Sequence, residues 1–385
     1  MTAKRGLGDL IPAHIASIRP YVPGRPIEEV ERELGVEAIK LASNENPLGP
    51  SPQAVEAMKR FLEGSHRYPD ASGYYLRAKL SERHAVPMEQ ITLGAGSTEL
   101  IQLMARVLLG PGNEGLTSEY SFVMFAQAVQ AAGGKLVEVP MKEWRFDLEG
   151  LAERVGPRTR LVYIANPNNP TGTLVTATEI DRLLAQLPDA TTLMIDEAYG
   201  DYVDHPDYSH SLDYVRRQPN FLLLRTFSKV HGLAGLRIGY AMGHPDLIAA
   251  IDKVRSPFNV SRLAQVAALA ALDDDEHIRR SVESNRRGLE LFARELPRLG
   301  LSCIPSFANF IFLEIGNDAQ EDFQALLKLG VIVRPLGFMG LPRAMRVTVG
   351  TEEENRRFLE ALKKLLATRS AHGVPDIQSV RGQST

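Results

Sequence analysis

The feature that most restricts the fold is a regular alternation of strand-like and helix-like segments along residues 91–195. Short apolar runs typical of buried strands are separated by longer segments whose apolar residues recur at helical spacing. This alternation predicts a mainly parallel sheet with helices on both faces, and such sheets bind ligands at the carboxyl ends of their strands. We expect strands at 91–93, 114–118, 135–139, 160–165 and 191–195, and helices at 99–108, 121–132, 147–154 and 176–186.

The length of the chain predicts two lobes. A chain of 385 residues, of which 44% are hydrophobic, exceeds the size at which a single core usually stops growing. The predicted fold class is α/β, with a large domain over 46–265 that holds the parallel sheet and a smaller α/β domain over 266–368. The N-terminal arm at 1–45 is expected to contribute to the smaller domain. The segment 369–385, rich in Ser, Gly, Gln and charge, is typical of a disordered tail.

Charge and cysteine content argue against several classes of function. The net charge of -3 provides no basic surface for nucleic acid or an anionic membrane, and no run is apolar enough to span a bilayer. The single cysteine, Cys303, excludes an internal disulfide, and the nine histidines lack metal-ligand spacing, so we expect no metal site. The start of the chain shows no signal-peptide pattern, so we expect a cytoplasmic protein.

One lysine lies where it could carry out covalent chemistry. Lys229 follows the apolar run Phe221–Arg225, among hydroxyls and glycines and shortly before Arg237. Lysine forms Schiff bases with aldehyde cofactors, but it must first lose its proton, so its pKa must fall from about 10.4. A nearby cation and partial burial would both lower that pKa. Taken alone, the Ser228-Lys229 pair also fits a surface lysine in a polar loop.

Two other strand ends carry polar side chains. The strand at 160–165 leads into the turn Asn166–Gly172, whose prolines and glycine indicate a rigid loop, although such turns are common. The strand at 191–195 ends at Asp196. A carboxylate directly after a buried strand needs a positive partner, such as the protonated nitrogen of a pyridine ring. A helix cap explains Asp196 equally well.

A glycine loop precedes the helix expected at 99–108. Gly94-Ala95-Gly96-Ser97-Thr98 would place backbone N–H groups at a helix start, where they hold an anion well. An ordinary turn between a strand and a helix is the alternative, because the loop lacks the ending of a P-loop and the third glycine of a dinucleotide fingerprint.

Together these motifs resemble those of the fold-type I pyridoxal-phosphate aminotransferases. Asn169-Pro170-Thr171-Gly172, Asp196-x-x-Tyr199 and Ser228-Lys229 with Arg237 occur in one order, each at a strand end, over about residues 10–368. The finer resemblance is to histidinol-phosphate aminotransferases. Their signatures are matched by Asn44-Glu45-Asn46-Pro47, Arg67-Tyr68-Pro69-Asp70, Asp196-Glu197-Ala198-Tyr199, Val333-Arg334 and Arg346-x-Thr348-x-Gly350.

The resemblance implies roles for the matching residues around pyridoxal 5'-phosphate. Lys229 would form a Schiff base with the cofactor and move the substrate proton, and Asp196 would keep the ring nitrogen protonated. Asn169 and Tyr199 would hydrogen-bond the 3-oxygen of the ring. The cofactor phosphate would be held by Gly96, Ser97, Thr98, Thr226, Ser228 and Arg237, and by Tyr68 of a second subunit, which implies a homodimer with shared sites.

The family also places an aromatic ring on the cofactor. Counting back from Gly133-Gly134 assigns this role to Phe122, with Tyr120 as the alternative. The sequence departs from the family here, because Tyr120-Ser121-Phe122 replaces the usual Pro-Thr-aromatic.

The substrate side of the site follows from the same resemblance. Arg346 would bind the carboxylate of glutamate, whereas Arg334 and Tyr21 would bind the phosphate of histidinol phosphate, and Asn46 is a further expected contact. Salt bridges could instead explain the two arginines, and Tyr21 could simply pack the arm.

The implied reaction converts L-histidinol phosphate and 2-oxoglutarate to imidazole acetol phosphate and glutamate, as in histidine biosynthesis. An aminotransferase of the same fold that prefers aromatic or other amino acids is the alternative. A catalytically silent cofactor-binding or regulatory module and a decarboxylase of the same fold are further possibilities. In each case the expected partners are small molecules, not nucleic acid or membranes.

Overall fold

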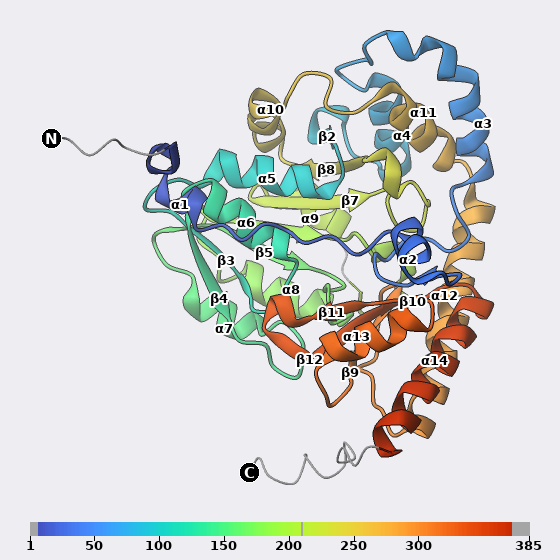
Figure 1. The fold of residues 1–385 in the computed structure, drawn as a ribbon. Coiled ribbons are helices and arrows are strands. Elements are labelled where there is room, and N and C mark those ends of the chain that lie inside the picture. Colours follow the sequence, from blue (N-terminus) through green and yellow to red (C-terminus); the bar gives the residue numbers. More distant parts are fainter. Residues whose placement is uncertain (1–6, 209–210, 372–385) are drawn as a thin grey trace, which may run out of the picture.

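The computed structural model describes residues 7–208 and 211–371. The larger lobe is built on strands β2 (Ile91–Gly94), β3 (Glu114–Ser118), β4 (Lys135–Val139), β5 (Thr159–Ala165), β6 (Thr192–Asp196), β7 (Phe221–Thr226) and β8 (Gly239–Gly243). They form one seven-stranded sheet in the order β2-β8-β7-β6-β5-β3-β4 (Figure 1). β8 runs opposite to the other six strands of this sheet, so the expected mainly parallel α/β sheet is confirmed.

Helices cover both faces of this sheet because successive strand residues point to opposite sides. Leu222 and Leu224 of β7 pack with α5, α6 and α10 on one face. Phe221 and Leu223 pack into the core of the other face, with α3, α4, α7, α8, α9 and α11. These helices are α3 (Pro52–Phe61), α4 (Tyr74–His84), α5 (Ser97–Leu108), α6 (Val123–Ala131), α7 (Leu148–Arg154), α8 (Ala177–Leu184), α9 (Ser211–Arg217), α10 (Pro245–Val254) and α11 (Arg262–Ala271).

A second hydrophobic core defines a smaller lobe. Its antiparallel sheet has the order β11-β12-β9, and a separate parallel pair joins β1 to β10. Phe292, Leu313, Val347 and Phe358 pack in this core together with Val30 from the N-terminal segment. The elements are β1 (Ile39–Lys40), β9 (Phe310–Glu314), β10 (Val331–Ile332), β11 (Arg334–Leu336), β12 (Leu341–Thr348), α2 (Ile27–Leu34), α12 (Asp275–Glu295), α13 (Ala319–Lys328) and α14 (Glu352–Ala371).

The N-terminal segment links the two lobes. From the short helix α1 (Ala13–Ala16) it runs across the molecule to α2, as the blue ribbon in Figure 1 shows. The side-chain amide of Gln127 in α6 donates a hydrogen bond to the Arg19 carbonyl at 2.8 Å. The segment therefore contacts the larger lobe before it enters the smaller one.

Two expected boundaries need correction. The core of the larger lobe includes Ala267, Ala268 and Ala271, so all of α11 belongs to that lobe. The boundary between the lobes therefore lies after α11, not at 265. α14 extends to Ala371, and Arg369 forms an ion pair with the buried carboxylate of Asp322, so the expected tail does not begin at 369. The rest of that tail, 372–385, lies outside the described residues. Within the described ranges, no helix has the length and apolarity needed to cross a membrane.

Candidate active site

Four polar segments meet at one edge of the large sheet. β5, β6 and β7 are parallel, so their carboxyl ends, followed by Asn169, Asp196 and Lys229, lie at the same edge. β8 runs in the opposite direction, so its first residues, and Arg237 just before them, return to that edge. One pocket of about 260 Å³ lies here, with a lining of Tyr21, Ser43, Asn44, Glu45, Ser97, Thr98, Phe122, Tyr163, Ala165, Pro167, Asn169, Asp196, Ala198, Tyr199, Thr226, Ser228, Lys229, Ala234, Arg237 and Arg346.

The start of α5 forms a cradle suited to an anion. Gly96 has a φ of 83°, and a Cβ there would lie 2.5 Å from Nη2 of Arg237, so only glycine leaves room for this guanidinium. Nη1 of Arg237 lies 3.4 Å from Oγ of Ser228, which also accepts a hydrogen bond from the Thr226 hydroxyl at 3.0 Å. Hydroxyls, a guanidinium and the N-terminus of a twelve-residue helix thus face one space, which favours a phosphate group.

Lys229 is half-buried and has an unusually acidic amine. Its Nζ lies 3.3 Å from the Ser43 carbonyl and 3.2 Å from that of Asn44. Burial is the largest of the effects that together lower the pKa of Lys229 to about 7; the cations Arg346 and Arg237 act in the same direction, and Glu45 and Asp196 oppose them. A large share of the amine is therefore neutral near neutral pH and can act as a nucleophile or base.

Asp196 is buried in the wall of the same pocket. Its Oδ2 accepts a hydrogen bond from the Tyr163 hydroxyl at 3.2 Å, and its Oδ1 accepts one from the Ala198 N–H at 3.0 Å. Burial raises the pKa of Asp196 to about 6, although these two donors favour the ionised form. Among the residues that the structure describes, no cationic side chain forms an ion pair with this carboxylate, which therefore suits a cationic ring nitrogen. A helix cap does not explain it, because the next helical turn is the 3-10 helix Gly200–Tyr202, whose N-cap position is occupied by Tyr199.

Arg346 reaches the pocket from the smaller lobe. Its Nη1 donates to Oδ1 of Asn169 at 2.6 Å and its Nη2 donates to the Ala42 carbonyl at 2.7 Å. Its Nε is buried without a hydrogen-bond partner among the described residues. Since neither partner is a carboxylate, the salt-bridge alternative for Arg346 is not what the structure shows. The guanidinium is held in place with capacity left for an anion.

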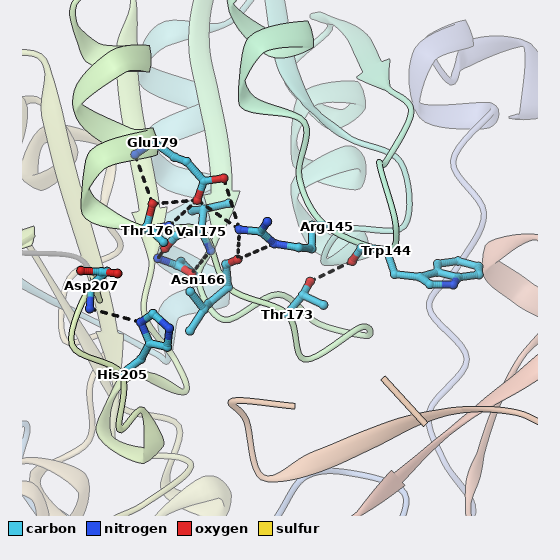
Figure 2. Close-up of polar contacts among 10 residues, drawn as sticks. Trp144, Arg145, Asn166, Thr173, Val175, Thr176, Glu179, His205 and Asp207 are labelled. Carbon is cyan, nitrogen blue, oxygen red and sulfur yellow. Dashed lines mark hydrogen bonds and ion pairs between the residues drawn. The ribbon is translucent and has the colours of Figure 1, made fainter. Parts of the chain in front are cut away.

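The loop that carries Asn169 is held at several points. The side chain of Asn166 and the backbone of Val175 bond reciprocally, with both distances at 3.0 Å. Figure 2 shows Arg145 bonding to Glu179, which also accepts from the backbone and hydroxyl of Thr176 in a capping box. Because both ends of the loop are tied to neighbouring elements, Asn169 presents its amide in a defined direction.

The positions of Phe122 and Tyr120 distinguish the two candidates for the aromatic ring that would stack on the cofactor. Phe122 lines the pocket, whereas Tyr120 packs against Trp144, with ring centroids 5.9 Å apart. Tyr120 has a φ of 52°, which turns the chain between the two rings. Of these two candidates, Phe122 is therefore the one available to a ligand ring.

Four expected contacts are not among the residues that line the pocket of this chain: Gly96, Asn46, Arg334 and Tyr68. Gly96 lies at the start of α5 beside the Arg237 guanidinium. The amide of Asn46 donates to the Val230 carbonyl and to Ser281 on α12, so the structure places this side chain outside the pocket of its own chain. Arg334 lies behind Tyr21, with its guanidinium 5.4 Å from that ring. Tyr68 is 80% exposed and stacks on Phe258, so it contributes nothing to the pocket of its own chain.

Several pocket residues were not among the expected ones. Asn44 and Glu45 belong to the Asn44-Glu45-Asn46-Pro47 motif, from which only Asn46 was assigned a contact. Tyr163 lies within β5 and reads as a core residue in the sequence. The adjacent motif was a usable signal for Asn44, but nothing in the local pattern distinguishes Tyr163 from its apolar neighbours.

The chain belongs to the class I and II aminotransferases, whose family model matches residues 36–362. Within this class it is similar to the histidinol-phosphate aminotransferases. It is 48% identical over 358 residues to histidinol-phosphate aminotransferase 1 of Nitrosococcus oceani, covering 93% of this chain and 97% of the relative. It is 46% identical over 355 residues to that of Moorella thermoacetica, covering 92% of each chain.

A solved structure shows the same architecture. The histidinol-phosphate aminotransferase from Sinorhizobium meliloti, crystallised in complex with pyridoxal-5'-phosphate, superposes with a TM-score of 0.86 at 30% identity. The match covers 93% of this chain and 98% of that one. The expected fold-type I aminotransferase architecture is confirmed.

Proposed function

We propose that this protein uses pyridoxal 5'-phosphate to transfer the amino group of L-histidinol phosphate to 2-oxoglutarate, which gives imidazole acetol phosphate and glutamate in histidine biosynthesis. The observation that carries the proposal is one pocket that combines the amine of Lys229, the carboxylate of Asp196 and the anion cradle beside Arg237. The 48% identity to a protein named histidinol-phosphate aminotransferase supports the choice of substrate.

The pocket residues fit this cofactor. Bound pyridoxal phosphate supplies an aldehyde for the amino group and a protonated ring that withdraws electrons from the carbon losing its proton. The cradle of Gly96, Ser97, Ser228 and Arg237 suits the phosphate, because it combines a guanidinium and hydroxyls with a helix N-terminus, and the glycine leaves room for the guanidinium. Asp196 suits the ring nitrogen, since a cation there would offset the cost of burying the carboxylate.

Lys229 would bond to the cofactor and, once released by the substrate, carry the proton. Its pKa of about 7 allows it both to accept and to return a proton near neutral pH. Tyr199 and Asn169 line the same pocket and would orient the ring through its 3-oxygen, and Phe122 would stack on its face. These residues would together orient the ring beside the Lys229 amine.

Two arginines would distinguish the two substrates. Arg346 is positioned by Asn169 and Ala42 to take a carboxylate in two hydrogen bonds, which suits glutamate and 2-oxoglutarate. Arg334 is held by the Val22 carbonyl behind Tyr21 and would contribute positive charge to the substrate phosphate. Tyr21 lines the pocket directly, so its hydroxyl would be the nearer contact.

The active unit would be a homodimer in the cytoplasm. Tyr68 and Phe258 stack on the surface with ring centroids 4.6 Å apart, and Tyr74 and Tyr75 nearby are also exposed. An exposed aromatic cluster of this kind is typical of an interface, where Tyr68 would reach the cofactor phosphate of the partner chain.

Initial rates with different amino donors test the substrate. With pyridoxal phosphate and 2-oxoglutarate present, we expect kcat/KM for L-histidinol phosphate to exceed that for phenylalanine and tyrosine. A larger value for either aromatic amino acid would replace the proposal by the aromatic alternative. Release of carbon dioxide would indicate a decarboxylase, and cofactor absorbance that glutamate leaves unchanged would indicate a non-catalytic module.

A further inference from the structure

Asn44 is a buried polar residue in the wall of the pocket that the roles above leave without a function. Its surface is 1% exposed, and its φ of 55° places its backbone in the left-handed region. Asparagine tolerates this region better than most residues. The conformation turns the side chain of Asn44 toward the pocket, whereas that of Asn46 points to α12.

The side chain of Asn44 joins the two lobes. Its Nδ2 donates a hydrogen bond to the hydroxyl oxygen of Tyr199 at 2.8 Å. Its Oδ1 accepts one from the Thr348 hydroxyl at 3.1 Å, and the Thr348 oxygen accepts from the Asn44 N–H at 2.9 Å. The Asn44 carbonyl accepts from Asn309 at 3.1 Å and lies 3.2 Å from Nζ of Lys229.

This arrangement determines where the Tyr199 hydroxyl can donate. Thr348 satisfies Oδ1 of Asn44, so the amide turns its N–H toward Tyr199. The Tyr199 oxygen is then an acceptor on the Asn44 side, and its own hydrogen must point elsewhere. Since Tyr199 lines the pocket, the hydrogen can point into the space where a cofactor ring would bind.

We propose that Asn44 is a positioning residue that directs the hydroxyl hydrogen of Tyr199 toward the 3-oxygen of the bound cofactor and ties this orientation to β12 through Thr348. The proposal rests on the proposed function, because it requires pyridoxal phosphate in the pocket. Thr348 and Arg346 lie on the same strand, so the residue that would bind the substrate carboxylate and the one that orients Tyr199 move together.

Spectroscopic titration of the bound cofactor tests this role. A hydrogen bond from Tyr199 to the 3-oxygen weakens the attraction of that oxygen for a proton on the Lys229 nitrogen, so losing it raises the pH at which cofactor absorbance changes. Asn44→Gly keeps the left-handed backbone but removes the amide. We expect its titration midpoint to rise by about one pH unit, the size of one net hydrogen bond.

A double-mutant cycle separates this route from a general structural effect. If Asn44 acts through Tyr199, the variant Asn44→Gly/Tyr199→Phe will show the same midpoint as Tyr199→Phe alone. An unchanged midpoint in Asn44→Gly, or shifts that add in the double variant, would overturn the proposal.

A second pair of variants keeps the proposal testable if Asn44→Gly does not fold. Thr348→Val removes the hydroxyl that orients the amide, whereas Thr348→Ser retains it. We expect Thr348→Val to raise the midpoint and Thr348→Ser to leave it near that of the unchanged protein; equal midpoints in the two variants would contradict the proposal. Titration of the unchanged protein comes first, because failure to bind the cofactor would reject the proposed function itself.

Discussion

Nη1 of Arg346 and Oδ1 of Asn169 lie 2.6 Å apart, although the two residues belong to different lobes and are 177 positions apart in the chain. A second hydrogen bond, to the Ala42 carbonyl, fixes the plane of the guanidinium. The arginine proposed for carboxylate binding is therefore oriented by an amide of the cofactor pocket, so the two halves of the site are assembled together.

We expect the two arginines to affect different substrates. Arg346→Lys should raise KM for 2-oxoglutarate about tenfold or more, because lysine cannot bind a carboxylate in two parallel bonds. The KM for histidinol phosphate should change less, since that substrate has no carboxylate. Arg334→Lys should instead raise KM for histidinol phosphate more than KM for 2-oxoglutarate. Steady-state kinetics with each substrate varied would measure this, and equal effects on both substrates would contradict the assignment.

Capture of the cofactor should depend on pH through Lys229. With a pKa of about 7, the amine is mostly protonated below that pH and mostly neutral above it, so the rate of pyridoxal phosphate capture should reach half its maximum near pH 7, not near 10. Stopped-flow absorbance of the cofactor-free protein would measure this rate. Lys229→Ala should abolish covalent capture and reduce turnover by at least about a hundredfold, whereas Lys253→Ala, at an exposed site on α10, serves as the matched control.

Burial of Asp196 should cost stability when no cofactor is bound. Its pKa is raised from 3.8 to about 6, so the folded chain binds the proton more tightly than the unfolded chain does. The loss of folding stability caused by burying the ionised carboxylate is therefore fully present above pH 6 and disappears as the pH falls toward 3.8. We expect Asp196→Asn to stabilise the cofactor-free protein by about 1 to 3 kcal/mol at pH 7.5.

Urea unfolding of both cofactor-free proteins at pH 7.5 and at pH 4.5 would measure this difference. The difference in unfolding free energy between the two proteins should be smaller at pH 4.5 than at pH 7.5. Turnover of the cofactor-loaded variant should fall sharply, because a neutral amide cannot hold a cationic ring nitrogen. A gap that is the same at both pH values would mean that the carboxylate charge is not its source.

Because Glu179 helps to anchor the Asn169 loop, we expect its replacement to lower both the stability of the protein and its retention of the cofactor. Glu179→Ala removes the capping box at the start of α8 and the partner of Arg145, so we expect a loss of about 1 to 2 kcal/mol in unfolding free energy. A loosened loop should also weaken cofactor retention, which dialysis followed by absorbance would detect. Arg182→Ala, an exposed change on the same helix, is the control. Normal cofactor retention in the destabilised variant would show that the loop does not depend on this anchor.

Much of the larger lobe could be predicted because its signals are local. A buried strand reveals itself by a short apolar run, and the residue that follows it necessarily lies at the sheet edge. For this reason the sequence alone predicts that Asp196 and Lys229 lie near one another, and both residues line one pocket in the structure. α4 and α9 are not among the predicted helices.

The sequence by itself determined the parallel sheet and the chemical groups at its edge, because strand periodicity and strand ends are encoded by neighbouring residues. Only the tertiary structure decided that Asn44 faces the pocket and Asn46 faces α12, that Phe122 and not Tyr120 is available to a ring, and that Arg346 meets Asn169. The physical reason is that each of these outcomes depends on backbone turns at Asn44 and Tyr120 or on packing between lobes. Such turns and contacts leave no periodic pattern in the chain.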